Sequence, residues 1–127
     1  MYISYYNMAK KKENKWAYVP YFRKPRDADS GTTCQQEQLC NEWIKEHLYD
    51  DDIKYIQTAA FYDWDDTPDY RLRGFLNALD SYESWNKLYE GATLVIPYRW
   101  CIPEYFWEQM RMEDSSIRIK VTNDLKL

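Results

Sequence analysis

The sequence predicts a three-layer α/β/α domain with a mainly parallel four-stranded sheet. Segments rich in strand-forming residues alternate with segments of helical period, an order typical of parallel sheets with right-handed crossovers. Residues 94–96 form a short apolar run, typical of a strand covered on both faces. The chain has 127 residues, of which 45% are hydrophobic, so it can build the core of one domain.

The beginning of the chain differs from the rest in charge. Residues 1–14 show no clear period and are predicted to be a flexible basic arm, followed by a single domain over residues 15–127. Residues 1–26 carry seven basic residues and one acid, whereas the remainder carries 10 basic and 20 acidic residues. The net charge of −4 excludes a nucleic-acid-binding protein that is basic throughout, but the arm could contact DNA locally.

The first strand and the first helix follow the arm. Residues 16–23 are rich in strand formers, with Pro20 as the one objection to a strand. After a turn-rich loop, two threonines at 32–33 stand three residues before two glutamines at 35–36, which is the spacing of a capping box. Apolar residues then recur at helical spacing as far as Leu48.

The remaining elements continue the alternation. Gly91 is predicted to end the second helix, because glycine is favoured just after a helix, and Pro103 to open the third. Residues 116–122 alternate between apolar and polar, so the last strand should have one wet face. The predicted elements are a strand at 53–62, a helix at 71–89, a strand at 94–96, a helix at 104–112 and a strand at 116–122.

One edge of the predicted sheet is the expected place for a ligand. In such folds ligands bind at the carboxyl ends of the strands, where the strand order reverses, and this places the loops 24–33 and 63–70 and the segment 98–103 together. The first loop offers cations and hydroxyls at a helix N-terminus, which attract phosphate. Alternatively, the hydroxyls only cap the helix and the cations are solvated. The candidate anion-binding residues are Arg23, Lys24, Arg26, Ser30, Arg73 and Arg99.

No metal site and no cofactor are predicted. Cysteines 34, 40 and 101 and the single histidine lack the closely spaced pairs of a zinc site. His47 lies in an apolar helical stripe, which is more typical of a packed histidine than of a catalytic one. The acidic runs 50–52 and 63–69 could bind Mg²⁺ beside phosphates, although such runs are more often solvated loops.

The sequence favours a cytoplasmic protein. It has no apolar run near the ~20 residues that span a bilayer, and the first 15 residues lack the core of a signal peptide. Three cysteines, an odd number, argue against a disulfide scaffold. We therefore expect no contact with membranes.

Three motifs have the order and spacing of a known family. Tyr-Phe-Arg-Lys-Pro ends the first strand at 21–25, Arg-Gly-Phe-Leu opens the second helix at 73–76, and Gly-Ala-Thr-Leu-Val-Ile leads through the third strand at 91–96. Over residues 16–122 the chain resembles the catalytic domain of serine recombinases, the resolvase and invertase family. That family has Tyr-x-Arg-Val-Ser, Arg-Pro-x-Leu and Gly-Ala-x-Leu-Val-Ile at these places.

Two single positions also fit the resemblance. The family has a glutamine near the start of its first helix, where Gln35 or Gln36 stands, and an acid at the end of its second strand, where Asp63 stands. The resemblance implies a resolvase-like fold. The chain stops where the family's long dimerisation helix and DNA-binding domain would follow, so a complete recombinase is not expected.

The departures from the family imply that its chemistry is lost. Pro25 stands at the position of the nucleophilic serine and has no hydroxyl. The two late arginines of the family align with Cys101 and Glu104, although Arg99 could replace one of them. Without the nucleophile and part of the arginine cluster, phosphoryl transfer should be abolished. The degenerate active-site positions are Arg23, Pro25, Gln35, Asp63, Arg73, Cys101 and Glu104.

The preferred hypothesis is a catalytically inactive, recombinase-like domain that acts as a protein-binding, structural or regulatory protein, as a phage or a mobile element could encode. Aromatic residues make up 18% of the chain, and some could form a surface for another protein or for a second copy of the chain. Alternatively, all of these rings pack internally. The candidate partner surface consists of Trp64, Trp100, Tyr105, Phe106 and Trp107.

Two other functions are compatible with the sequence. One is a small phosphotransfer or nucleic-acid-processing enzyme that uses Arg23, Ser30 and Arg73. The other is an acidic inhibitor that mimics DNA through the acids at 50–52 and 63–69, with binding that weakens steeply with salt.

Overall fold

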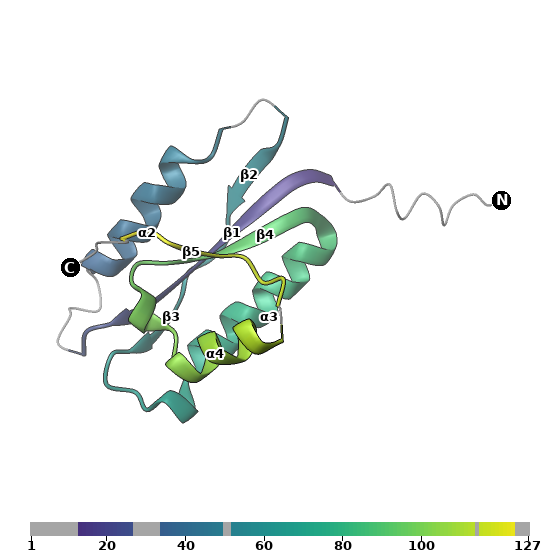
Figure 1. Cartoon of the computed structure of the whole chain (residues 1–127). Coiled ribbons are helices and arrows are strands. Elements are labelled where there is room, and N and C mark those ends of the chain that lie inside the picture. The colour runs from purple at the N-terminus through teal and green to yellow at the C-terminus, as the bar shows by residue number, and fades with distance from the viewer. Residues whose placement is uncertain (1–12, 27–33, 50–51, 114, 124–127) are drawn as a thin grey trace.

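The computed structural model describes residues 13–26, 34–49, 52–113 and 115–123, which form an α/β fold with a parallel sheet (Figure 1). The predicted α/β class and the mainly parallel sheet are thereby confirmed. The elements are β1 (Glu13–Lys24), α2 (Gln35–Glu46), β2 (Lys54–Gln57), β3 (Phe61–Trp64), α3 (Arg73–Leu88), β4 (Tyr89–Ile96), α4 (Glu104–Met112) and β5 (Ile119–Val121), with short 3₁₀ helices η1 (Asp69–Arg71) and η2 (Arg99–Cys101).

The central strand β1 organises the sheet. The strand order is β2-β1-β4-β5, and β3 pairs with β1 on the edge that β2 also uses. The single strand predicted at 53–62 is therefore wrong: it is two strands separated by residues 58–60, so the sheet has five strands instead of four. The order reverses between β1 and β4, and their carboxyl ends form the edge where the sequence predicts a ligand site.

Pro20 is tolerated in the middle of β1 because it lies beside the break between β2 and β3. The carbonyl of Tyr18 accepts a hydrogen bond from the N–H of Thr58, so it points toward that edge. Residues two apart in a strand direct their main-chain groups to the same side. The missing N–H of Pro20 therefore falls at the break, where no strand residue needs it.

Helices cover both faces of the sheet. Odd-numbered residues of β1, such as Val19 and Tyr21, pack against α3, whereas Tyr18 packs with residues of α2 on the other face. The larger core cluster lies between β1, β4 and α3. This alternation of side chains along β1 is what lets one strand serve two cores.

Two of the helix signals predicted from the sequence are not seen at helix ends in the described residues. The capping positions predicted at 32–33 lie outside the described residues, and the N-cap of α2 is Cys34, which makes no side-chain capping bond. Gly91 does not follow a helix but lies inside β4, which begins at Tyr89. A Cβ at Gly91 would lie 2.5 Å from Cη2 of Trp16, so the glycine is required by the ring that rests on it.

The strand predicted at 94–96 is the end of β4, which begins five residues earlier, and the other boundaries agree with the prediction within three residues. The helix predicted at 104–112 is confirmed as α4, and α3 begins two residues later than predicted because η1 precedes it. β5 is shorter than predicted, although a bond from the Asn123 N–H to the Pro97 carbonyl extends its pairing with the β4 segment. Glu13 and Asn14 belong to β1, so the domain begins at least two residues before its predicted start, and the rest of the predicted arm, residues 1–12, lies outside the described part.

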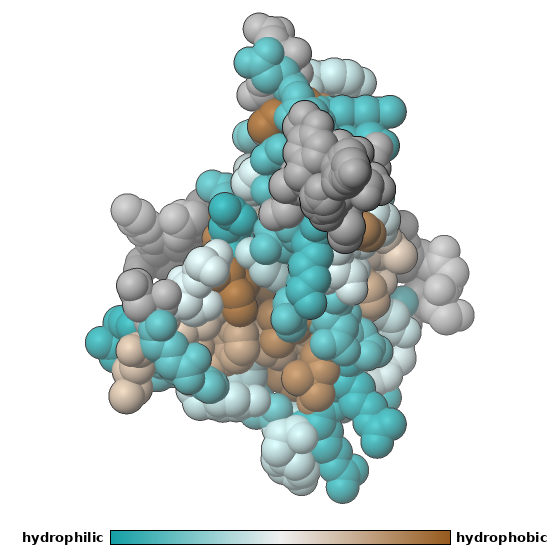
Figure 2. All heavy atoms as spheres, turned by 90° about the vertical axis from the view of Figure 1, so that its right-hand side faces the viewer, coloured by the Kyte–Doolittle hydropathy of each residue, from teal (hydrophilic) through white to brown (hydrophobic). Residues whose placement is uncertain are grey.

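One face of the molecule has a hydrophobic area. Figure 2 shows brown and tan residues gathered on the lower part of this face, where α3 and α4 lie, with hydrophilic residues around them. Among the described helices, none has the length and apolar character that crossing a bilayer needs.

Candidate functional site

The carboxyl edge of the sheet gathers the segments that the sequence predicts there. Arg23, the next to last residue of β1, is only 4% exposed. Its Nε donates to the carbonyl of Trp64 (3.1 Å). Its Nη2 donates to the carbonyls of Asp65 (3.2 Å) and Thr67 (2.8 Å). The guanidinium thus binds the loop after β3, and these three carbonyls use three of its five N–H donors.

A buried glutamine joins β1 to the segment after β4. The side-chain Oε1 of Gln36 accepts a hydrogen bond from the N–H of Arg23 (3.0 Å) and lies 3.6 Å from Sγ of Cys101. Gln36 is buried at the start of α2, whereas Gln35, the candidate position, is exposed. Cys101 is fully buried. The first helix therefore contributes Gln36 to this edge, and the Cys101 thiol lies in the core.

Asp63 caps the N-terminus of α3 from the neighbouring strand β3. Its Oδ1 accepts a hydrogen bond from the N–H of Gly74 (2.8 Å), and its Oδ2 from the N–H of Phe75 (2.9 Å). The residue before the helix, Leu72, makes no side-chain capping bond. A carboxylate is favoured here by the free N–H groups and by the helix dipole.

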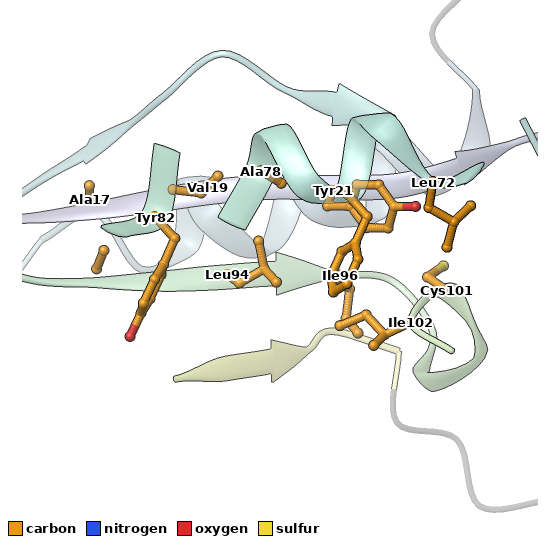
Figure 3. Close-up of a cluster of buried hydrophobic side chains, with 12 residues drawn as sticks. Ala17, Val19, Tyr21, Leu72, Ala78, Tyr82, Leu94, Ile96, Cys101 and Ile102 are labelled. Carbon is orange, nitrogen blue, oxygen red and sulfur yellow. The ribbon is translucent and has the colours of Figure 1, made fainter. Parts of the chain in front are cut away.

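Tyr21 donates to the same carboxylate. Its hydroxyl lies 2.7 Å from Oδ2 of Asp63, and Figure 3 shows it pointing toward Leu72, at the start of α3. Burial, together with the hydrogen bond to Asp63, raises the pKa of Tyr21 well above its ordinary value. The proton therefore stays on the tyrosine, and the pair serves as a structural link between β1, β3 and α3.

The cations after Arg23 lie on aromatic rings. Nζ of Lys24 lies 5.4 Å from the ring centroid of Tyr62 and 5.8 Å from that of Trp64. The guanidinium of Arg26 lies 4.7 Å from the Trp64 ring and forms an ion pair of 2.8 Å with Asp66. Their hydrogen bond raises the pKa of Arg26 and lowers that of Asp66. Trp64, a candidate partner residue, is thus half-covered by these cations.

The remaining candidate positions are dispersed. Arg99 pairs with Glu104 (3.2 Å) and its guanidinium lies 4.4 Å from the Trp107 ring centroid. Arg73 is exposed at the first turn of α3, and Pro25 is half-buried just after β1. Ser30 lies outside the described residues. Because several of these cations have partners within the protein, the described residues do not form a single anion-binding cluster.

Five apolar and aromatic residues form a groove between η1, α3 and α4, which we call the α3–α4 groove: Tyr70, Leu76, Leu79, Tyr105 and Phe106. It has a volume of about 270 Å³ and also contacts Leu72, Phe75, Asp69 and Gln109. Three of its residues are strongly exposed, Tyr70 at 80%, Leu76 at 59% and Tyr105 at 56%. Exposed apolar groups that converge in this way are typical of binding surfaces.

The groove contains only part of the candidate partner surface. Tyr105 and Phe106 line it, and Phe106 also packs edge-on against Phe75 with a centroid distance of 4.9 Å. Trp107 turns its Nε1 to the carbonyl of Arg99 (3.1 Å). Trp100 is 54% exposed and stacks on Tyr98. The predicted surface therefore divides between the groove, the η2 segment and β3.

The acidic loop and the histidine offer less chemistry. Asp65, Asp66 and Asp69 are exposed, whereas Asp63 is buried as a helix cap. Within the described residues, no group of three histidine, cysteine or acidic side chains could hold a metal ion. The His47 ring is exposed and stacks on Trp43 with a centroid distance of 3.9 Å.

Sequence reasoning missed several residues that the structure makes important. Gln36 is buried with Cys40 and Ile44, four and eight residues later, so the helical period contained the signal that distinguishes it from Gln35. Tyr70 and Leu76 needed the tertiary structure, because an exposed tyrosine and an exposed leucine have no signature in the sequence. The capping role of Asp63 also depends on the approach of β3 to α3.

We expect the three cysteines to be unreactive in the native protein. Cys34, Cys40 and Cys101 are all buried free thiols, and burial raises the pKa of Cys101 from 9.0 to about 11. With Ellman's reagent near pH 8, the native chain should release almost no colour, and all three thiols should react after unfolding in urea. Rapid reaction of a thiol in the folded chain would contradict the burial of these cysteines.

The raised thiol pKa values also predict alkaline destabilisation. Burial raises the pKa of Cys40 as well as that of Cys101, so the unfolded state loses these protons at a lower pH than the folded state. The contribution of Cys101 to stability should be fully present below pH 9.0 and be lost between pH 9.0 and about 11. Urea midpoints measured across this range test the sign, and Cys101→Ala should reduce the slope.

The comparisons with protein-family models, curated proteins and solved structures gave no match to this chain. The resemblance to serine recombinases therefore stays a prediction from the motifs.

Proposed function

We propose that this chain is a non-catalytic, resolvase-like three-layer domain that acts by binding protein through the α3–α4 groove. The observation that carries the proposal is the contrast between two sites. The edge where a recombinase would hold its phosphodiester contains Pro25, and Arg23 there is bonded to three carbonyls of its own chain. The α3–α4 groove, in contrast, leaves its aromatic and apolar side chains open to solvent.

The charges at the groove favour a second copy of this chain as the occupant. Arg71 and Arg73 are exposed beside Tyr70 and Leu76, while Asp69 lines the groove itself. A two-fold interface brings each patch against its own copy, so a surface with both signs of charge can pair with itself. The half-exposed rings then supply the apolar centre of the contact.

Leu76→Glu should weaken self-association without loss of stability. A carboxylate in an apolar contact must be desolvated without a partner, so the dissociation constant in sedimentation equilibrium should rise by at least about tenfold. The matched control is Leu88→Glu, because Leu88 lies in the same helix and is also 59% exposed. It should leave the dissociation constant unchanged, and both variants should keep the urea midpoint of the wild type.

Two further outcomes decide the proposal. The wild-type chain could stay monomeric and instead form a cross-link to another protein in its host. If Leu76→Glu abolishes this cross-link and Leu88→Glu retains it, the other protein is the occupant of the groove and the second copy is not. A chain without either contact is not a protein-binding domain. Nicking of supercoiled plasmid, or a covalent adduct with DNA, would instead favour the phosphotransfer enzyme, and Ser30→Ala would then test the nucleophile.

A further inference from the structure

A second surface lies on the opposite side of the sheet, where side chains rather than a helix complete the covering. In the described part of the chain, α2 is the helix on this face, and its buried residues meet Tyr18 of β1 and Val95 of β4. Toward β5 the surface is formed by Trp16, Arg118 and Lys120. Figure 1 shows α2 beside β1 and β2, and β5 at the far side of β4.

Trp16 is fixed on this face. Its ring rests on Gly91, and its Nε1 donates to Oγ1 of Thr93 (2.8 Å). The guanidinium of Arg118 lies 4.8 Å from the ring centroid, on a residue that remains exposed. Arg118 Nη1 also lies 3.5 Å from Oδ1 of Asn86. The result is a layer of glycine backbone, indole and guanidinium, with the guanidinium outermost.

Lys120, two residues after Arg118, also lies over a tryptophan ring. Its Nζ lies 5.7 Å from the ring centroid of Trp43, and the lysine is exposed. Within the described residues, neither Arg118 nor Lys120 forms an ion pair. Arg118 immediately precedes β5 and Lys120 lies within it, so the two residues, two apart in extended chain, direct their side chains to the same face of the sheet.

We propose that this face, formed by Trp16, Trp43, Arg118 and Lys120, binds single-stranded nucleic acid. A base stacks on the outer side of the Arg118 guanidinium, which the Trp16 ring supports from beneath, and a neighbouring phosphate pairs with Lys120. Proteins bind single strands by this combination of aromatic or guanidinium planes with cations along the backbone. Because the rings already hold both cations in place, binding loses less side-chain entropy.

The acids of α2 favour a single strand over a duplex. Glu42 and Glu46 are exposed on the helix that carries Trp43. They repel a second phosphate backbone laid across α2, whereas a single strand along β5 contacts the cations alone. The proposal is independent of the α3–α4 groove, which lies on α3 and α4 at the other face, and of the basic residues before β1.

The test is fluorescence anisotropy with a labelled oligothymidylate of about 12 nucleotides. The wild-type chain should bind it, with an affinity that falls as salt rises from ~50 to ~200 mM. The double variant Arg118→Glu/Lys120→Glu should lose at least about tenfold in affinity. The matched control Lys54→Glu/Lys87→Glu changes the net charge equally at exposed positions elsewhere and should bind as the wild type.

Two more measurements make the result specific. Glu46→Gln should reduce the preference for the single strand over a duplex, because it removes a negative charge from the helix that carries Trp43. The proposal is overturned if the oligothymidylate does not bind at low salt, if the two double variants behave alike, or if a duplex or a poly-glutamate peptide binds as tightly as the single strand. Urea midpoints of every variant establish that a loss of binding is not a loss of folding.

Discussion

Gly74→Ala should destabilise the protein by at least ~3 kcal/mol, although alanine favours a helix by roughly 1 kcal/mol over glycine. A Cβ at Gly74 would overlap the carbonyl group of Tyr62, 2.6 Å from its carbon, and this carbonyl is a backbone group that cannot move aside as a flexible side chain could. The start of α3 would have to withdraw from β3, which would also lengthen the hydrogen bonds to Asp63. The free energy of urea unfolding measures the loss.

A control in the same helix isolates this contact. Asn77 is exposed on α3, so Asn77→Ala should change stability by less than ~0.5 kcal/mol. An alanine at 74 that leaves stability unchanged, or raises it, would show that α3 does not approach β3 as closely as described. The sign of the effect is therefore decisive, because helix propensity and packing predict opposite changes.

Asp63→Asn should cost roughly 3 kcal/mol of stability, because an amide cannot accept three hydrogen bonds as the carboxylate does. The asparagine nitrogen would face a donor, either the Tyr21 hydroxyl or one of the helix N–H groups, in a buried site. Loss of the charge also removes its favourable interaction with the dipole of α3. Urea unfolding at neutral pH gives the change in free energy.

Two variants show whether the carboxylate acts through these bonds. Asp66→Asn removes an exposed acid whose partner is Arg26 on the surface, and we expect little change in stability. A double-mutant cycle with Tyr21→Phe should give a coupling of ~1–3 kcal/mol between Tyr21 and Asp63. Additive effects of the two substitutions would contradict the shared hydrogen bond.

The sequence predicted those parts of the fold that depend on local pattern. The apolar stripe of α3 and the proline that opens α4 placed both helices to within two residues. The break between β2 and β3 was missed, because Thr58, Ala59 and Ala60 have no strong turn signal. Gly91 was misread, because the reason for the glycine is a ring 75 residues earlier in the chain.

For three of the candidate residues the sequence predicted the location at the edge of the sheet, but it did not predict their hydrogen-bond partners. Arg23, Asp63 and Cys101 do converge at the carboxyl edge, as the strand order requires. Their partners could not be read from the sequence, since a buried arginine bonded to carbonyls and an arginine bonded to phosphate have the same residue type. The α3–α4 groove and the β5 face are products of packing, which a single sequence does not display.

The central position of β1 has a consequence for how the chain folds as it is made. The strand is synthesised first among the described elements, yet its neighbours are β2, β3 and β4, the last of which ends at Ile96. Until that residue has left the ribosome, the edge of β1 that pairs with β4 lacks its final partner, although β2 and β3 are already made. Contacts this distant along the chain slow folding and leave strand edges open to aggregation.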